Sequence, residues 1–308
     1  VCFEKPPGDT RPASPGYYNL AEAHRLGREA GRRIETINGD AFSHAVKAEA
    51  IAALKERFGK VDLVVYSLAS PKRKDPDSDT VWSSVLKPVG EPHLSKTVNL
   101  RDETVEEVTI QPASEAEVFA TERVMGGDDW RLWIEALRDA DLLADGCRSV
   151  AYSYIGPQVT YPIYRSGTIG NAKEHLEATG KELAALLREH CGGGAWVSVN
   201  KALVTQASAA IPVVPLYISI LYKVMKEAGS HEETMEQIVR LFRDHIGPGA
   251  TPSCDDAGRI RIDDRELAPA IQARVEEIWP AITTVNLETL SDFAAFRTAF
   301  RRLFGFEV

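Results

Sequence analysis

The chain has 308 residues, four cysteines and a formal net charge of −9 at neutral pH. This length allows one large α/β domain or two smaller ones, and the acidic balance argues against a nucleic-acid partner, which needs a basic face on the protein. The cysteines lie far apart, the histidines form no metal-ligand spacing, and no run reaches the roughly 20 apolar residues that span a bilayer. We therefore expect a cytoplasmic protein without a disulfide, a metal or a membrane span.

Strand-like and helical runs alternate through the first part of the chain. Strands are expected at residues 1–3, 33–37 and 61–66, separated by helices over about residues 20–32 and 41–58. This alternation is typical of βαβ units in a parallel sheet. The third strand is apolar almost throughout, as expected when helices cover both faces of a sheet.

The alternation stops after Pro71. Three prolines punctuate the polar stretch that follows, which leads to an apolar-polar alternation at residues 105–111, so a two- or three-stranded antiparallel insertion is predicted over residues 72–112. The expected elements after it are helices at about 114–125 and 128–143, a strand at 149–154, a helix from about 168 to 190, and a strand at 196–199.

The remaining chain, residues 205–308, is predicted to be a helix-rich substrate-binding region within one catalytic domain, 1–308. Its helices are expected near residues 216–226, 232–244, 264–279 and 287–303. Residues 204–222 form the most apolar stretch of the chain. They are either a buried core helix or the wall of a pocket for an apolar ligand, because ligand pockets are mostly apolar.

Tyr164 and Lys173 are the candidate catalytic residues. Eight residues separate them, and Pro162 and Gly167 predict that Tyr164 lies in a loop before the helix that contains Lys173. A phenol and an ammonium beside a nicotinamide can protonate a carbanion or an enolate. With nine tyrosines in the chain, the spacing alone could arise by chance.

Three segments are candidates for a dinucleotide site. Glu4 closes the first expected strand, where a carboxylate can bind ribose hydroxyls and repel the 2′-phosphate of NADPH. Lys5 would weaken this preference for NADH over NADPH. Alternatively, Glu4 is only a solvated residue at the end of a strand. Asp40 can cap the next helix, accept the adenine amino group, or do both. Residues 67–71 follow the third strand and form either a close approach to the cofactor or a simple turn.

A glycine-rich phosphate loop after a first strand should precede these segments in a dinucleotide-binding fold. The chain contains none at that position, and Gly192–Gly194 follows a helix with the wrong spacing. We therefore expect the intact protein to carry additional N-terminal residues with the first strand and this loop.

Several motifs together resemble the trans-2-enoyl-CoA reductases and the V-type bacterial enoyl-ACP reductases. The most specific is Ala151-Tyr-Ser-Tyr-Ile-Gly156 followed by Tyr164 and Lys173 at their extended spacing. The other motifs, in chain order, are Phe3-Glu-Lys-Pro6, Ile37-Asn-Gly-Asp-Ala-Phe-Ser43, the segment 61–71, Lys87-Pro-Val-Gly-Glu-Pro92, Val124-Met-Gly-Gly127 and the segment 204–212.

The resemblance covers essentially the whole chain. It implies an α/β fold, a Rossmann-like doubly wound parallel sheet with a small antiparallel insertion and additional helices that form a substrate lid. Members usually continue at both ends, so truncation at the C-terminus is expected as well as at the N-terminus. The implied partner is an enoyl-CoA or an acyl-carrier-protein-bound substrate, and a monomer is expected.

The resemblance also implies roles for single residues. Tyr164 would be the catalytic acid, Lys173 would support it and contact the cofactor, and Tyr154 would bind substrate near the thioester. The implied NADH contacts are Phe3, Glu4, Asp40, Ala41, Leu68, Ala69, Lys173, Leu203, Val204 and Thr205.

The expected reaction is NADH-dependent reduction of the trans-2 double bond of an enoyl thioester. Hydride would reach Cβ, and Tyr164 would stabilise the enolate or protonate it, with its pKa lowered by the ammonium of Lys173. Two alternatives remain open at this point: a carbonyl reductase with the same Tyr/Lys pair, and a non-catalytic dinucleotide-binding module.

Overall fold

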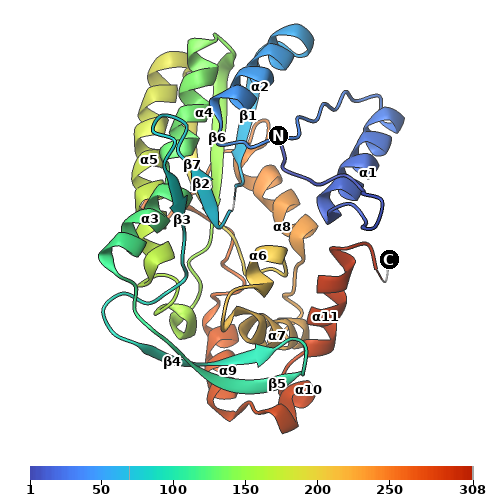
Figure 1. Ribbon diagram of the computed structural model, residues 1–308, viewed down its shortest axis with the longest axis vertical. Helices are drawn as coiled ribbons and strands as arrows, with labels where there is room; N and C mark the ends of the chain where they lie inside the picture. Colours follow the sequence, from blue (N-terminus) through green and yellow to red (C-terminus); the bar gives the residue numbers. More distant parts are fainter. Residues whose placement is uncertain (69, 307–308) are drawn as a thin grey trace.

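A computed structural model describes residues 1–68 and 70–306 of the protein. Its centre is a sheet of four strands in the order β1 (Val61–Tyr66), β6 (Leu143–Ser153), β7 (Gly194–Val199) and β8 (Ile260–Arg261) (Figure 1). Every neighbouring pair is parallel. The predicted α/β fold with a parallel sheet is therefore confirmed. Sequence patterning missed β8, which has two residues and no periodicity to detect.

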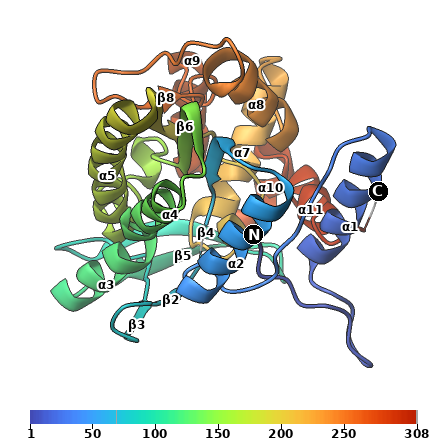
Figure 2. The ribbon, with the colours of Figure 1, turned by 90° about the horizontal axis from the view of Figure 1, so that it is seen from above.

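Helices cover both faces of this sheet. On one face lie α2 (His44–Arg57), α4 (Asp128–Asp139) and α5 (Thr168–Cys191), joined to the strands by an apolar cluster that includes Trp130, Leu183 and Ala151. The other face packs against α8 (Thr234–Leu241) and the π-helical turn Phe242–Ile246. Figure 2 shows the sheet between these two layers. The doubly wound arrangement follows from this two-sided burial.

The segment after β1 forms two separate hairpins. β2 (Lys72–Lys74) pairs with β3 (Val81–Ser83), and β4 (His93–Asn99) pairs with β5 (Thr104–Ile110). The first hairpin contacts α3 (Glu115–Met125), whereas β4 contacts α7 (Val214–Glu227) near the other end of the molecule (Figure 1). The antiparallel insertion was predicted correctly, but its four strands exceed the two or three expected.

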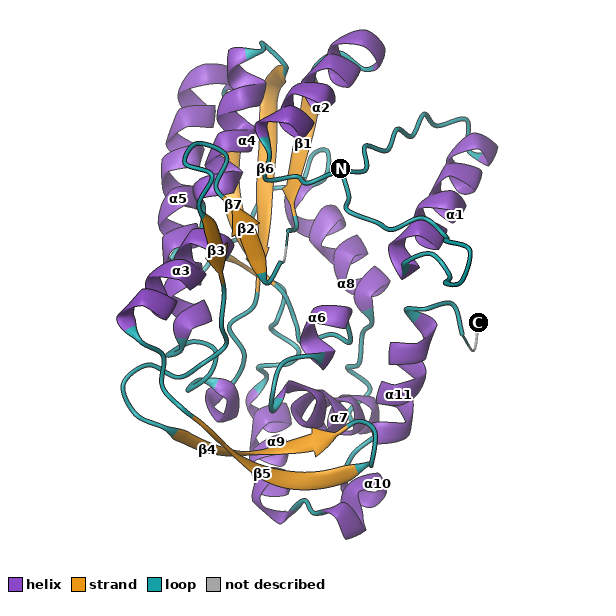
Figure 3. Ribbon diagram, viewed as in Figure 1, coloured by secondary structure: helices purple, strands orange, loops and turns teal. Residues whose placement is uncertain are grey.

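A second core surrounds α7, eleven of whose residues are buried. Around it lie α9 (Pro269–Ala281), α10 (Leu287–Leu290) and α11 (Phe293–Arg302), together with the β4–β5 hairpin (Figure 3). Lys96 connects the hairpin to α9, because its ammonium donates to the carbonyl oxygens of Pro280 at 2.7 Å and Ile282 at 2.9 Å. The described residues also include three short helical segments: α6 (Gln206–Ala209), Gln158–Thr160 and Thr284–Asn286.

The strands expected at residues 1–3 and 33–37 are the clearest error. α1 (Pro15–Glu29) lies between these two segments in the chain. The first segment pairs with the end of the second at one isolated parallel bridge, between Cys2 and Asn38. Two backbone hydrogen bonds hold the bridge, from Cys2 N to Ile37 O at 2.9 Å and from Gly39 N to Cys2 O at 2.8 Å. A strand needs a continuous ladder along a neighbour, and apolar residues alone do not supply one. Phe3 is accordingly 74% exposed.

Candidate functional site

Three predicted site segments begin where neighbouring parallel strands end. Leu68 follows β1, Tyr154 directly follows β6, and Leu203 follows β7 by four positions. Because β1, β6 and β7 are adjacent and parallel, their carboxyl ends share one edge of the sheet. Ligands of open α/β sheets bind at this edge.

Tyr164 and Tyr154 contact each other at this edge. Their rings meet edge to face, with centroids 4.9 Å apart and planes at 90°. Tyr164 is buried, and the loop before α5 fixes its backbone, because its N–H donates to the carbonyl oxygen of Thr160 at 3.0 Å. The predicted loop position of Tyr164 is confirmed.

The start of α5 is tied to the chain that joins the two hairpins. The Thr168 N–H donates to Lys87 O at 3.0 Å, and its hydroxyl donates to Val85 O at 2.5 Å. Lys173 lies in this helix, as predicted, and its ammonium donates to Tyr152 O at 3.4 Å beside the end of β6. The helix is thereby fixed against the same strand that leads to Tyr154.

The environment of Lys173 lowers its basicity. Burial lowers the pKa of Lys173 to about 8, and the nearby carboxylate of Glu177 opposes this shift. Burial removes water from the ammonium, which favours the neutral amine and brings its pKa closer to neutral pH. The side chain can therefore be a cation when it binds a cofactor and still exchange a proton.

Tyr164 departs from the mechanism expected from the sequence. Its pKa is raised, first because burial disfavours the phenolate and second because the negative charge of Glu266 repels it. The expectation that Lys173 lowers this pKa is therefore wrong for this structure. Tyr164 is a fully protonated phenol, which suits a hydrogen-bond donor or an acid.

A buried carboxylate, Glu266, binds the hydroxyl of Tyr154 and that of a third tyrosine, Tyr217, and it was not predicted. Its side chain has no exposed surface. Oε1 accepts from the hydroxyls of Tyr154 at 2.9 Å and Tyr217 at 2.6 Å, and Oε2 accepts from Ala202 N–H at 2.6 Å. Glu266 lies 112 positions from Tyr154, in a charged run that resembles a solvated loop, so no local spacing could reveal it.

The loop that carries Leu203, Val204 and Thr205 lies next to this carboxylate. Val204 is buried in the same core cluster as Tyr164. Leu203 O accepts from Ser208 Oγ at 2.8 Å, and Thr205 caps α6 because its hydroxyl accepts from Ser208 N–H at 3.0 Å. The loop is thus held at both ends beside the tyrosine pair.

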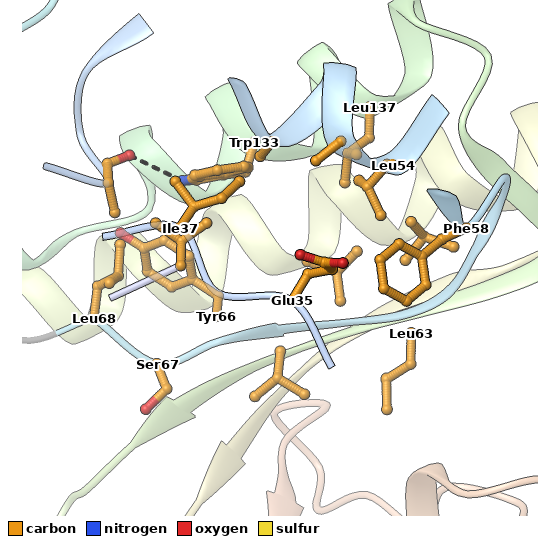
Figure 4. Close-up of a pocket in the computed structure, with 17 residues that line it drawn as sticks. Glu35, Ile37, Leu54, Phe58, Leu63, Tyr66, Ser67, Leu68, Trp133 and Leu137 are labelled. Carbon is orange, nitrogen blue, oxygen red and sulfur yellow. Dashed lines mark hydrogen bonds between the residues drawn. The ribbon is translucent and has the colours of Figure 1, made fainter. Parts of the chain in front are cut away.

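A cavity of about 460 Å³ lies along the outer side of β1. Among its lining residues are Ala41 and Leu68, two of the predicted cofactor contacts, with Tyr66 and Trp133 close by (Figure 4). The Trp133 indole N–H donates to Ala41 O at 3.2 Å, the dashed line in the figure. The cavity is apolar and adjoins the carboxyl end of β1, so it fits part of a dinucleotide.

The loop 38–43 at this cavity is built differently from the prediction. Asp40 does not cap α2: its carboxylate accepts from Phe42 N–H at 3.0 Å, and Ser43 is the cap, accepting from Val46 N–H at 3.2 Å. Asp40 sits three positions too early for the cap, so its side chain closes a local turn instead. Lys47 then fixes the loop from behind, donating to Ala41 O and Phe42 O at 2.9 Å.

Phe3 and Glu4 occupy a separate place at the N-terminal segment. Asn38 clamps the backbone of Glu4, since Glu4 N–H donates to Asn38 Oδ1 and Asn38 Nδ2 donates to Glu4 O, both at 2.7 Å. The Glu4 carboxylate accepts from the Ser14 hydroxyl. The last predicted cofactor contact, Ala69, lies outside the described residues.

In residues 1–68 and 70–306 no group of three or more His, Cys, Asp or Glu side chains could hold a metal ion. No helix within these ranges is long and apolar enough to cross a membrane. All four cysteines are free thiols.

Comparison with known proteins identifies relatives over nearly the full chain. Residues 11–246 match the family described as "Trans-2-enoyl-CoA reductase catalytic region". An enoyl-[acyl-carrier-protein] reductase [NADH] of Opitutus terrae is 55% identical over 99% of this chain and 77% of its own. A trans-2-enoyl-CoA reductase [NADH] of Clostridium perfringens is 53% identical over 99% and 78%. The crystal structure of Clostridium acetobutulicum trans-2-enoyl-CoA reductase with NADH has a TM-score of 0.96 at 41% identity, covering 100% of this chain and 77% of that one.

Residues 254–308 match a second family, described as "Enoyl reductase FAD binding domain". The described residues of this segment, 254–306, do not fit a flavin. Phe293 and Phe296 are buried in the core around α7, and Arg259 and Arg261 are paired with carboxylates. The cavity of about 180 Å³ that this segment helps to line is below the roughly 300–1,000 Å³ of typical cofactor sites.

Proposed function

Because this chain belongs to the trans-2-enoyl-CoA reductase family, we propose that it reduces the trans-2 double bond of enoyl thioesters with NADH. One observation of the site carries the proposal. Tyr154 and Tyr164 are in ring contact at the carboxyl edge of a parallel sheet, beside the loop 203–205. A neutral phenol at the edge where dinucleotides bind is the group that a conjugate reduction needs next to its carbonyl oxygen.

The cofactor would lie along the carboxyl ends of β1, β6 and β7. We assign Ala41 and Leu68 to its adenosine and nicotinamide sides, since both line one cavity. Leu203, Val204 and Thr205, on the loop after β7, would hold its nicotinamide and phosphate region. Phe3, Glu4 and Asp40 would complete the adenosine end. Bound NADH supplies a hydride to Cβ of the enoyl thioester.

Tyr164 acts on the oxygen that becomes negative. Hydride addition at Cβ moves an electron pair onto the thioester oxygen, and a phenol hydrogen bond stabilises that enolate. Tyr164 holds its proton firmly, because its pKa is raised by burial and by Glu266. The Tyr164 hydroxyl therefore donates to the oxygen. Its proton then passes to Cα to give the saturated thioester, and Tyr164 recovers a proton from water.

Lys173 has a positioning and charge-balancing role. Its ammonium is held beside the end of β6 through Tyr152 O. A cation there can bind ribose hydroxyls and offset the charge that develops on the thioester oxygen. Its pKa of about 8 keeps most of the population charged at neutral pH.

The acyl chain would enter the second core. α7 is buried along most of its length, and Val213 and Ile211 share a cluster with Tyr164. We propose that residues 205–308 form the substrate-binding region of a single domain, 1–308, and that 72–112 is an insertion whose second hairpin supports α7. The strand β8 of this region pairs with β7, so hydrogen bonds connect the region to the main sheet.

The carrier, the oligomeric state and the compartment are further parts of the proposal. Relatives at 55% and 53% identity are named for acyl carrier protein and for CoA, so either thioester is a candidate substrate. We propose a monomer in the cytoplasm. The four free thiols suit a reducing compartment, and sedimentation of the purified protein would test the monomer.

A substrate panel tests the reaction class. NADH oxidation should be measured side by side with crotonyl-CoA, longer enoyl-CoAs, an enoyl-ACP and simple ketones. The proposal predicts turnover with the enoyl thioesters and none with ketones. Turnover with ketones alone would identify a carbonyl reductase, and a protein that binds no NADH would be a non-catalytic module.

A further inference from the structure

We infer that Glu266 is a positioning residue which decides the roles of the two site phenols, by taking the hydroxyl hydrogen of Tyr154 and leaving that of Tyr164 for the substrate. The inference rests on the proposed reductase function. It concerns a residue with no motif, on the loop between β8 and α9.

The hydrogen bonds around Glu266 set the direction of each donor. Gln272 Nε2 donates to the Tyr217 hydroxyl oxygen at 3.2 Å, so the Tyr217 hydrogen is directed to Glu266 Oε1 at 2.6 Å. Tyr154 donates to the same oxygen at 2.9 Å, and Ala202 N–H donates to Oε2 at 2.6 Å. Three donors converge on one carboxylate, which is the pattern expected of its ionised form.

The negative charge of Glu266 is stabilised by protein groups alone, away from water. Glu266 has no exposed surface, and Lys201, 3% exposed, lies beside it with its ammonium donating to Ala202 O at 2.8 Å. Burial raises the pKa of Glu266, and the three donors and the Lys201 charge oppose that shift. A buried carboxylate with satisfied oxygens is rigid, because any rotation would break a hydrogen bond that water cannot replace.

The two phenols therefore differ in what they can offer. Tyr154 has its hydrogen committed to Glu266 and can present only an oxygen lone pair to a ligand. Tyr164 touches Tyr154 through its ring, and within the described residues its hydroxyl has no hydrogen-bond partner. Only the Tyr164 hydroxyl has a hydrogen ready for the thioester oxygen.

Glu266 also connects Tyr154 to the segment 203–205, which is proposed to bind the cofactor. Its second oxygen holds the N–H of Ala202, the residue before Leu203. Gln237 Oε1 holds the preceding N–H, that of Lys201, at 3.2 Å. The carboxylate thus fixes Tyr154 and the start of the 203–205 segment in one geometry.

The test compares Glu266→Gln and Glu266→Ala with wild type, using NADH and crotonyl-CoA. In Glu266→Gln the amide oxygen can keep Ala202 while its NH₂ faces the tyrosines, which releases the Tyr154 hydrogen. We expect kcat to fall on the order of 10²-fold, the loss typical of a misplaced group, with KM for NADH little changed. Glu266→Ala should also raise KM for NADH, because the loop loses its anchor.

Two further variants separate positioning from stability. Glu232→Gln alters another buried glutamate, 3% exposed and paired with Arg240, and should lower the melting temperature while leaving kcat and KM unchanged. Adding Tyr154→Phe to Glu266→Gln should cause no further loss of kcat, because both changes act on one hydrogen bond. Should Glu266→Gln fail to fold, Tyr154→Phe alone is expected to lower kcat without changing KM for NADH.

The outcomes are distinguishable. An active wild-type enzyme with an equally active Glu266→Gln variant overturns the inference and leaves the reductase function standing. If Tyr154→Phe leaves kcat unchanged, or changes kcat and the KM for NADH equally, the inference is likewise overturned and the reductase function stands. A wild-type protein that does not reduce crotonyl-CoA removes both the function and the inference.

Discussion

The site differs from a simple Tyr/Lys pair at the level of single residues. Lys173 donates to Tyr152 O near the end of β6, whereas the hydroxyl of Tyr154 donates to the carboxylate of Glu266. Negative rather than positive charge acts on Tyr164, whose pKa is raised. The phenol is therefore held as a donor, and stabilisation of the enolate falls to hydrogen bonding and to the Lys173 cation.

The titration of Lys173 predicts opposite pH dependences for function and stability. Because its pKa is about 8, kcat/KM for NADH should fall as pH rises through about 8 and the ammonium is lost. The unfolded lysine keeps its proton up to about pH 10.4, so between these values the unfolded state binds more protons and the free energy of unfolding should rise with pH.

Lys173→Gln is the control for this pair of profiles. It should remove the fall in kcat/KM near pH 8 and the accompanying rise in the free energy of unfolding measured in urea. A wild-type kinetic profile that is flat through pH 8, or a Lys173→Gln profile that still falls there, would contradict the assignment.

Glu4 carries the prediction for cofactor choice. Its backbone is clamped by Asn38 and its carboxylate accepts from the Ser14 hydroxyl. In the proposed site this carboxylate would face the ribose 2′-position of the cofactor. Glu4→Ala should reduce the preference for NADH over NADPH on the order of fivefold to tenfold, since like charges about 4 Å apart in water repel by roughly 1 kcal/mol. The ratio of the two kcat/KM values measures it. Glu22→Ala, on the exposed face of α1, should leave the ratio unchanged, and an unchanged ratio in Glu4→Ala would remove Glu4 from the site.

At the level of elements, α5 and the loop before it place Tyr164. A Cβ added at Gly170 would lie 2.0 Å from Arg165 O and 2.6 Å from Tyr164 O, so no side chain fits there. Gly170→Ala should therefore displace the Tyr164 loop and lower kcat on the order of 10²-fold. Steady-state kinetics with crotonyl-CoA would show this loss.

The same helix offers a matched control. At Gly180 the nearest atom to an added Cβ is the Trp130 ring at 3.2 Å, and a small adjustment of the ring can accommodate it. Gly180→Ala is thus expected to change the melting temperature slightly and to leave kcat intact. Equal kinetic effects of the two substitutions would show that the Tyr164 loop is not set by the start of α5.

Sequence periodicity predicted the elements whose apolar patterns are long. α5 and α7 were expected to within about two residues of their observed ends, and β1 was predicted in full. The errors fall where neighbours decide the structure: residues 1–3 form one bridge instead of a strand, and β8 is too short to have a pattern. The tyrosines could be found from a motif, whereas Glu266 depends on tertiary folding that brings residues 112 positions apart together.

At the scale of the whole molecule, one buried ion pair joins α2 to α4 beside the cavity along β1. Lys47 Nζ and Asp129 Oδ1 lie 2.6 Å apart, and the two residues are only 2% and 1% exposed. Asp129→Asn would leave a buried ammonium without its partner, which should cost about 3–5 kcal/mol. Urea unfolding, followed by circular dichroism, would measure the loss. Asp141→Asn, which breaks the exposed pair with Lys60, should leave the unfolding midpoint unchanged.

The stability prediction fails if both substitutions shift the midpoint equally. In that case the buried pair would contribute no more to stability than the exposed pair of Lys60 and Asp141.

The carboxyl edge of the sheet and the core around α7 meet at the pair Tyr154 and Tyr164. This arrangement is the basis of the proposed reductase function. The most direct test is single-turnover oxidation of NADH by wild type and Tyr164→Phe with crotonyl-CoA, together with the Kd for NADH. Loss of the acid should slow turnover by about 10²–10⁴-fold while the Kd stays within experimental error of wild type. Wild-type turnover by Tyr164→Phe would contradict the assignment of Tyr164.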